Sequence, residues 1–227
     1  MAGNRHVIIV GPQGAGKGTQ AAVVAPKLGL VHLSTGDLFR EVMASDTELG
    51  REIRGYYDRG TLVPDQLTIR MLTQHLDQIE THRPDVRGVL LDGFPRNQAQ
   101  AEALDQALEE RGDTLAAVIQ IAVPRAALMD RLTGRLICRV CGATYHRLYN
   151  PPNQAGVCDV CGGELYQRSD DTPEAVERRL NIYYEQTEPI LTHYASTGLL
   201  VDVNGDRPIP EVTESILEAL GTKLGAA

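Results

Sequence analysis

Short apolar runs alternate with longer segments of helical periodicity along most of this chain. The compact run at residues 7–10 ends directly before a glycine, and comparable runs occupy 31–33, 89–91, 117–123 and 199–203. Short apolar runs bounded by turn residues are typical of strands that are buried on both faces of a sheet. We therefore predict a β-strand in each of these segments.

Apolar residues recur at helical spacing in the segments between these runs. Pro64 suits the first turn of a helix, and Asp171-Thr172-Pro173-Glu174 has the composition of a helix start. Strands that alternate with helices of this length imply βαβ units, and hence a parallel sheet covered by helices on both faces. The predicted helices span residues 17–28, 36–44, 48–59, 64–79, 97–111, 124–132, 172–195 and 209–220.

The segment 134–171 breaks this alternation. It is rich in Gly, Cys, Tyr and Asn, and Pro151-Pro152 lies near its middle. Clusters of such residues favour turns over long helices or buried strands. We interpret this segment as a small subdomain inserted into the α/β core.

Composition narrows the possible partners. The 227 residues carry a formal net charge of −8, which argues against a general nucleic-acid binder but still allows a few arginines to line an anion site. The first apolar run is too short for a signal peptide, and no later run approaches the length of a membrane span. The sequence therefore predicts a cytoplasmic protein that binds neither nucleic acid nor membrane.

A glycine-rich loop runs from Gly11 to Thr19, between the first predicted strand and the first predicted helix. This context is typical of a phosphate-binding loop, in which backbone N–H groups and a lysine, here Lys17, contact phosphate oxygens. The strict pattern has Ser or Thr directly after the lysine, whereas this chain has Gly18 there. A Mg²⁺ ion would then be held partly through water. The alternative is a glycine-rich turn with a surface lysine, which the strand–loop–helix context disfavours.

Four cysteines form two matched pairs within the inserted segment. Cys138 and Cys141 are followed, after sixteen intervening residues, by Cys158 and Cys161. This C-x2-C…C-x2-C spacing is typical of a structural Zn²⁺ site with four thiolate ligands. Two disulfides or a redox pair are the alternatives, and the cytoplasmic interpretation disfavours disulfides. His146 lies nearby, but four thiolates already complete the shell, so we interpret it as an ordinary polar residue.

Several further motifs occur in a fixed order. With them, the chain from about Arg5 to Leu220 resembles the adenylate kinase family of nucleoside monophosphate kinases, in the form whose lid binds zinc. The motifs are Gly16-Lys17-Gly18-Thr19-Gln20, Ser34-Thr35-Gly36-Asp37, Leu91-Asp92-Gly93-Phe94-Pro95-Arg96, Gly134-Arg135, Arg168-Ser169-Asp170-Asp171 and Arg178-Arg179-Leu180.

The resemblance implies a fold, a reaction and a division into domains. The fold would be α/β, with a P-loop, a parallel five-stranded sheet flanked by helices, a small helical NMP-binding insert and a zinc-binding lid insert. The core would comprise 1–33, 64–133 and 172–227, the NMP-binding insert 34–63 and the lid 134–171. The reaction would be the reversible, Mg²⁺-dependent conversion of ATP and AMP into two ADP, in purine nucleotide metabolism and energy homeostasis. Both inserts would close over the nucleotides to exclude water.

The resemblance also implies roles for individual residues, and in-line phosphoryl transfer needs such charge-stabilising arginines. The catalytic residues would be Lys17, Arg96, Arg135, Arg168 and Arg179. The ATP side would comprise Gly14, Ala15, Gly16, Lys17, Gly18, Thr19, Arg131, Arg135, Thr144, Tyr145 and Arg207. The AMP side would comprise Thr35, Arg40, Leu62, Val63, Gly93, Phe94, Arg96, Gln100, Arg168 and Arg179, with Asp92 beside Mg²⁺ and its waters.

Three other functions compete with this one. A kinase of the same architecture could act on UMP, CMP or GMP, and Thr35, Val63 and Gln100 favour AMP only through the resemblance. A zinc-ribbon nucleic-acid module should carry a basic ribbon, yet 138–161 has two arginines against one aspartate. A simple ATPase needs no second arginine-lined acceptor site. We expect a monomer whose partners are ATP, AMP and ADP.

Overall fold

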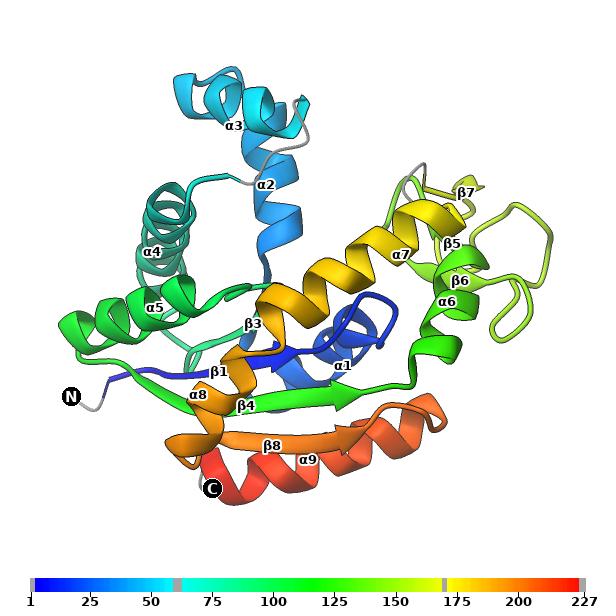
Figure 1. Ribbon diagram of the computed structural model, residues 1–227. Helices are drawn as coiled ribbons and strands as arrows, with labels where there is room; N and C mark the ends of the chain where they lie inside the picture. Colours follow the sequence, from blue (N-terminus) through cyan, green and yellow to red (C-terminus); the bar gives the residue numbers. More distant parts are fainter. Residues whose placement is uncertain (1–2, 59–62, 169–170, 225–227) are drawn as a thin grey trace.

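The computed structural model describes residues 3–58, 63–168 and 171–224, and a five-stranded parallel sheet lies at its centre (Figure 1). Each strand predicted from the apolar pattern is present, and the prediction of a parallel five-stranded sheet is confirmed. The sheet order is β2-β3-β1-β4-β8, so the first strand of the chain is the central one. The strands are β1 (Arg5–Val10), β2 (Val31–Ser34), β3 (Val89–Asp92), β4 (Thr114–Ala122) and β8 (Leu200–Asn204).

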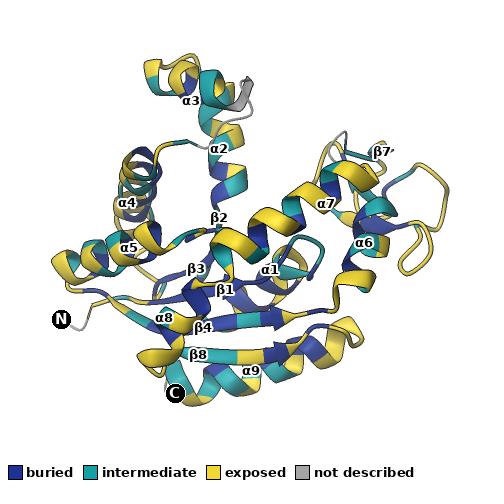
Figure 2. Ribbon diagram, viewed as in Figure 1, coloured by how far each residue is buried: buried dark blue, intermediate teal, exposed yellow. Residues whose placement is uncertain are grey.

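Helices cover both faces of this sheet, as the fully apolar strands require. Val7 and Ile9 of β1 pack into a cluster with α1 (Lys17–Lys27) and α9 (Ile209–Leu224). Ile8 and Val10 point to the opposite face, and their cluster includes side chains of α4 (Asp65–His82), α5 (Gln98–Arg111) and α8 (Ile190–Ser196). The alternation of side chains along β1 thus divides the core into two layers, and the central strands β1 and β4 are mainly buried in Figure 2.

Two parts of the chain extend away from the sheet in Figure 1. The first contains α2 (Thr35–Ala44) and α3 (Glu48–Asp58), which pack on each other around Leu38 and Ile53. The second follows α6 (Arg125–Thr133) and contains β5 (Arg135–Cys138), β6 (Thr144–His146) and β7 (Leu165–Tyr166) in a small antiparallel sheet. The sequence pattern did not predict these three strands, because strands of two to four residues are too short to show alternation.

The helix predicted over 172–195 is not continuous. It begins as α7 (Pro173–Ile182), passes through a π-helical turn, η1 (Tyr183–Thr187), and resumes as α8. Its start is as predicted, because the Thr172 hydroxyl accepts a hydrogen bond from the Ala175 N–H at 3.3 Å. The interruption was missed, since one residue inserted into a helical turn barely alters a 3.6-residue pattern.

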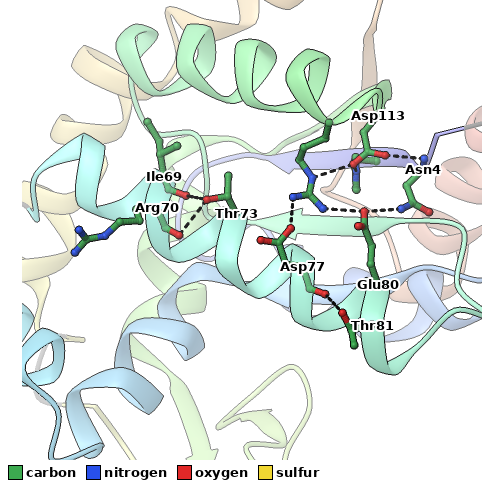
Figure 3. Close-up of polar contacts among 10 residues, drawn as sticks. Asn4, Ile69, Arg70, Thr73, Asp77, Glu80, Thr81 and Asp113 are labelled. Carbon is green, nitrogen blue, oxygen red and sulfur yellow. Dashed lines mark hydrogen bonds and ion pairs between the residues drawn. The ribbon is translucent and has the colours of Figure 1, made fainter.

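A network of charged groups joins α4 and α5 at the edge of the sheet formed by the amino ends of the strands (Figure 3). Arg111, the last residue of α5, forms ion pairs with Asp77, with Glu80 at 2.8 Å and with Asp113 at 3.2 Å. The Asp113 side chain is only 4% exposed, and it also accepts a hydrogen bond from the Asn4 N–H at 2.8 Å. Arg111 therefore compensates the charge of a buried carboxylate and ties α4 to the start of β4.

No helix in the described parts of the chain has both the length and the apolar character that crossing a membrane requires.

We expect Arg111→Met to lower the free energy of unfolding by about 3 kcal/mol, because it leaves the buried Asp113 carboxylate without its cation. Urea denaturation of the purified protein measures this change. Arg83→Met is the matched control, since Arg83 pairs with Asp85 and both side chains are more than half exposed. The control should leave the denaturation midpoint almost unchanged. Equal stability of the two variants would contradict the proposed contribution of the Arg111 ion pairs to the free energy of unfolding.

Candidate active site

Several of the predicted site residues lie at the edge of the sheet where the strands end. The phosphate loop follows β1, Thr35 follows β2, and Asp92 and Arg96 lie at and after the end of β3. Helix α6 begins after β4, and the turn that contains Arg207 follows β8. Because all five strands are parallel, their carboxyl ends meet at this one edge, where open α/β sheets bind their ligands. Residues more than 190 positions apart thereby contribute to one region.

The phosphate loop has the backbone shape that its glycines permit. Gly14 and Gly16 have φ of 84° and 93°, in the left-handed region that other residues rarely adopt. Gly14 also lies close to α6, since a Cβ there would come within 2.9 Å of Leu132 Cγ. Helix α1 begins directly after Gly16 without a side-chain cap, so its first N–H groups remain available to an anion. Gly18 and Thr19 are exposed on the first turn of α1.

Lys17 is folded back over the loop that it follows. Its Nζ donates hydrogen bonds to Gly11 O at 2.8 Å and Pro12 O at 3.0 Å. Burial lowers the pKa of Lys17 to about 8, and the nearby charge of Asp92 opposes this shift. The positive charges of Arg96, Arg179 and Arg135 lower the pKa further. Lys17 thus experiences the charges of one acid and three arginines, which come from β3, α7, β5 and the loop after β3.

The Asp92 carboxylate faces the phosphate loop. A Cβ at Gly18 would lie 3.5 Å from Asp92 Oδ2, so a side chain here would come into contact with the acid. On its other side, His32 Nε2 lies 3.5 Å from the same oxygen. His32 was not predicted as a site residue, because nothing in the local pattern of β2 distinguishes a histidine facing the site from one at a sheet surface.

A buried acid joins two of the predicted catalytic arginines. The Asp171 side chain is 0% exposed and accepts two hydrogen bonds from Arg135, at 2.9 Å and 2.6 Å. Arg179 NH1 lies 3.4 Å from the same carboxylate. Bidentate pairing fixes the plane of a guanidinium as well as its position. From the sequence, Asp171 was predicted as part of a helix start and of a family motif, without a partner, whereas in the structure it orients both arginines.

The residues predicted for AMP surround the ends of β2 and β3. Thr35 is buried and donates a hydrogen bond to Asp92 O at 3.3 Å, while Gln100 Oε1 accepts one from the Arg96 N–H at 2.8 Å. Arg40 forms an ion pair with Asp37. Gly93 lies next to Thr35 and has a φ of 83°. Phe94 is part of the core, and Val63 packs against the cluster around Leu38. Leu62, which was predicted to contact the nucleobase, lies outside the described residues.

The residues predicted for ATP outside the phosphate loop lie in two places. Arg131 and Arg207 lie at the turn after β8, and Arg135, Thr144 and Tyr145 belong to the small antiparallel sheet. Arg131 donates hydrogen bonds to Gly205 O at 3.1 Å and to Asp206 at 2.9 Å, so it touches the turn that contains Arg207. Arg207 itself donates to Ser215 Oγ at 2.7 Å. Thr144 is exposed on β6, whereas the Tyr145 side chain, also predicted for ATP, is buried beside the cysteines. Arg168, predicted for the AMP side, follows β7 by two residues.

Gln20, although part of the quoted motif, has a structural role, because its side chain joins two helices. Its Nε2 donates to Ile209 O at 3.1 Å, and its Oε1 accepts a hydrogen bond from Thr213 at 2.7 Å, which ties α1 to α9.

The four cysteines converge in the lid. Their sulfur atoms all lie within 4.8 Å of one another, and Cys138–Cys161 and Cys141–Cys158 are 3.5 and 3.6 Å apart. These distances are too long for disulfides. Four sulfurs at about 2.3 Å from one Zn²⁺ would be about 3.8 Å apart, so the cluster fits a structural zinc. The hydroxyl of Tyr145 lies 3.5 Å from Cys158 Sγ, and this hydrogen bond lowers the pKa of the thiol to about 6.

A hollow of about 1000 Å³ lies at the opposite edge of the sheet, between the end of α1 and the loop after α4. None of the predicted site residues lines it. Arg5 in its wall donates to backbone carbonyls at the end of α9, and Arg111 pairs with three carboxylates. We attribute these cations to the stability of the fold, because the phosphate loop and the carboxyl ends of the strands are at the other edge.

A glycine-rich phosphate loop whose lysine lies among arginines at one sheet edge defines a P-loop phosphotransferase. The model of the adenylate kinase family matches residues 9–199 of this chain. Adenylate kinases of Desulforudis audaxviator and Carboxydothermus hydrogenoformans are each 52% identical to it, over 95% and 94% of this chain and 99% and 98% of theirs. That of Streptomyces avermitilis is 51% identical over 95% of this chain and 96% of its own length. The chain therefore belongs to the adenylate kinase family, whose members are ATP:AMP phosphotransferases of the nucleoside monophosphate kinase class.

We expect ATP binding to take up a proton near pH 8, because phosphate charges raise the lowered pKa of Lys17. The amine is charged below this pH, so affinity is full there and falls as the pH rises through about 8. Isothermal titration calorimetry in buffers of different ionisation enthalpy measures this uptake. Lys17→Arg is the control, since a guanidinium stays charged and takes up no proton. The same proton uptake in wild type and control would contradict this assignment.

Proposed function

We propose that this chain transfers the terminal phosphoryl group of ATP to AMP at the edge formed by the carboxyl ends of the strands. The observation that carries the proposal is the convergence on Lys17 of charges from Asp92, Arg96, Arg135 and Arg179. Phosphoryl transfer requires little covalent chemistry from a protein, and depends on alignment and on positive charge around the transferred group. This arrangement of charges supplies both.

The roles of the residues follow from the side on which each lies. The phosphate loop and Lys17 would hold the β- and γ-phosphates of ATP, and Arg131 with the turn before Arg207 would contact its base. Thr35, Gln100 and Arg96 would hold AMP. An oxygen of the AMP phosphate attacks the γ-phosphorus, and the bond from that phosphorus to the β-phosphate oxygen breaks. Arg135, Arg168 and Arg179 would stabilise the charge that spreads over the transferred group.

Family members use Mg²⁺ together with ATP, and the ion neutralises charge on the phosphates when it is bound. In this chain Asp92 is the fitting acid, because its carboxylate faces Gly18 on the phosphate loop. Thr19 lies one residue beyond the position where a hydroxyl ligand normally follows the lysine. We therefore assign Asp92 to the waters of the ion, with no direct hydroxyl ligand at position 18.

We propose 34–63 and 134–171 as two inserts that close over acceptor and donor when the nucleotides bind. The first contains α2 and α3, and the second contains the small antiparallel sheet. Closure excludes water, which would otherwise compete with AMP as the acceptor.

A coupled assay that offers ATP with AMP, UMP, CMP or GMP in turn tests this function. We expect ADP formation to be fastest with AMP, and ATP alone to be hydrolysed slowly because the acceptor side is empty. A higher rate with another monophosphate would change the assigned acceptor. Equally fast turnover with ATP alone would instead favour a simple ATPase and remove the need for the acceptor arginines.

We propose that the four cysteines hold a structural Zn²⁺. The cluster closes a small lid whose own core is limited to a few side chains around Tyr145 and Leu165. A lid with so little apolar burial gains folding energy from a metal, since binding and folding are coupled in such sites. Four thiolates leave no open coordination position, so the ion would contribute stability rather than chemistry.

Removal of Zn²⁺ by a chelator should lower the thermal midpoint by about 5 °C or more, because the lid then loses its cross-link. Activity measured well below that midpoint should persist. Differential scanning calorimetry and the coupled assay, run on the same metal-free sample with metal content determined, separate the two effects. Complete loss of catalysis in a metal-free protein that is still folded would overturn the structural role.

A further inference from the structure

Hydrogen bonds among the described residues hold Arg96 and the loop around it. Its N–H donates to Gln100 Oε1, its carbonyl accepts from Thr187 Oγ1, and its side-chain Nε donates to Gly93 O, each at 2.8 Å. Two of these bonds come from the loop and helix that immediately surround Arg96. The bond from Thr187 crosses 91 positions of sequence and comes from the π-helical turn η1.

The hydroxyl of Thr187 is used differently from those of several other helical threonines. Thr73, Thr81 and Thr133 each donate to the carbonyl four residues earlier in their own helix, at 3.1, 2.8 and 2.9 Å. That internal bond is the usual one for a threonine within a helix. Thr187 instead donates across the space between η1 and the loop that follows β3.

The π-helical turn explains how Thr187 reaches that loop. The Glu188 N–H bonds to Tyr183 O at 2.9 Å, five residues back instead of four. Pro189 follows and has no N–H of its own, so the helix must accommodate one missing donor at this point. The wider turn changes the direction in which Thr187 projects relative to a continuous α-helix. Single π-helical turns inside α-helices occur frequently at functional sites.

Gln100, which accepts the hydrogen bond from the Arg96 N–H, is itself held in place. Gln100 is buried, and its Nε2 donates to Asp65 Oδ1 at 2.6 Å. Asn97 donates to both oxygens of the same carboxylate, at 3.3 and 3.4 Å, and caps α5 by accepting the Gln100 N–H at 2.8 Å. The N–H side of Arg96 is therefore fixed by α4 and α5, and Thr187 holds the carbonyl side.

We propose that Thr187 is a positioning residue for the transfer reaction, which acts by holding the Arg96 loop against the helix that carries Arg179. Helix α7 contains Arg179 and continues directly into η1, so the Thr187 hydrogen bond links the helix of one phosphate-binding arginine to the backbone of the other. This inference rests on the proposed function, because it needs Arg96 and Arg179 to act on the same phosphate groups. A misplacement of about 1 Å in such groups can slow catalysis about a hundredfold.

The test replaces Thr187 by valine, which has the same shape and β-branching but no hydroxyl. We expect Thr187→Val to lower kcat about tenfold, since that corresponds to one lost, well-oriented hydrogen bond. The KM for ATP should stay within about twofold, because the phosphate loop is untouched. Thr187→Ser keeps the hydroxyl and should restore most of kcat. Thr81→Val, on the exposed surface of α4, is the matched control and should leave kcat unchanged.

A double-mutant cycle shows whether Thr187 acts through Arg96. In an Arg96→Lys background, Thr187→Val should lower kcat by no more than about twofold, because the guanidinium that Thr187 positions is already gone. The full tenfold loss in that background would overturn the proposal. So would a lowered thermal midpoint with unchanged kcat, which would make Thr187 a purely structural residue.

Failure of the inference can be separated from failure of the proposed function. Wild-type protein without transfer from ATP to AMP, or an Arg96→Lys variant with wild-type kinetics, would refute the assigned function of the site. Normal wild-type transfer and a strong Arg96→Lys defect, with a neutral Thr187→Val, would refute only the role of Thr187.

Discussion

The parallel pairing of β1 with β3 on one side and β4 on the other is the constraint on which the site depends. Neighbouring parallel strands end at the same edge of the sheet, so the loops that follow these strands lie next to one another. The phosphate loop after β1 and Arg96 after β3 therefore share that edge although the chain separates them by almost eighty positions. Both faces of the sheet are occupied by helices, which leaves this edge as the natural place for a ligand.

The second requirement is to hold several cations close together before any phosphate arrives. Acids meet it: the buried Asp171 lies between Arg135 and Arg179, and the partly buried Asp92 opposes the loss of charge on Lys17. Asp171 thus orients Arg135 and Arg179, and a phosphate that binds these arginines must either displace this carboxylate or use the N–H groups that it leaves open. A molecule with a formal net charge of −8 in this way keeps a local concentration of positive charge at one sheet edge.

Sequence reasoning succeeded wherever a local pattern has a single physical explanation. Apolar runs next to glycines located the core strands, and the glycines before Lys17 indicated the phosphate loop because their left-handed conformations are unavailable to other residues. The paired cysteines indicated a cluster, since thiolates at that spacing have few other uses. The assignments of individual residues to ATP and AMP remain proposals.

The features that sequence reasoning missed depend on partners distant in the chain. Nothing near Asp171 indicates that it will be buried between two arginines, and nothing near His32 indicates that it will face Asp92. The π-helical turn was not predicted, because the apolar positions on either side of Tyr183 still fit a helix. The strands of the lid are too short for a periodic pattern, and their apolar side chains Leu136, Tyr145 and Leu165 pack together beside the cysteines.

The central place of β1 has a consequence for the order in which the molecule can be assembled. During synthesis β1 emerges first, yet its second neighbour, β4, begins only at Thr114, and the sheet is complete only at Asn204. Contacts so distant in sequence form slowly and leave apolar strand faces exposed meanwhile. The lid lies between β4 and β8 and makes its own strand pairs within about thirty residues. The strand pairs of the lid can therefore form on a nascent chain before β8, the last strand of the core sheet, has been synthesised.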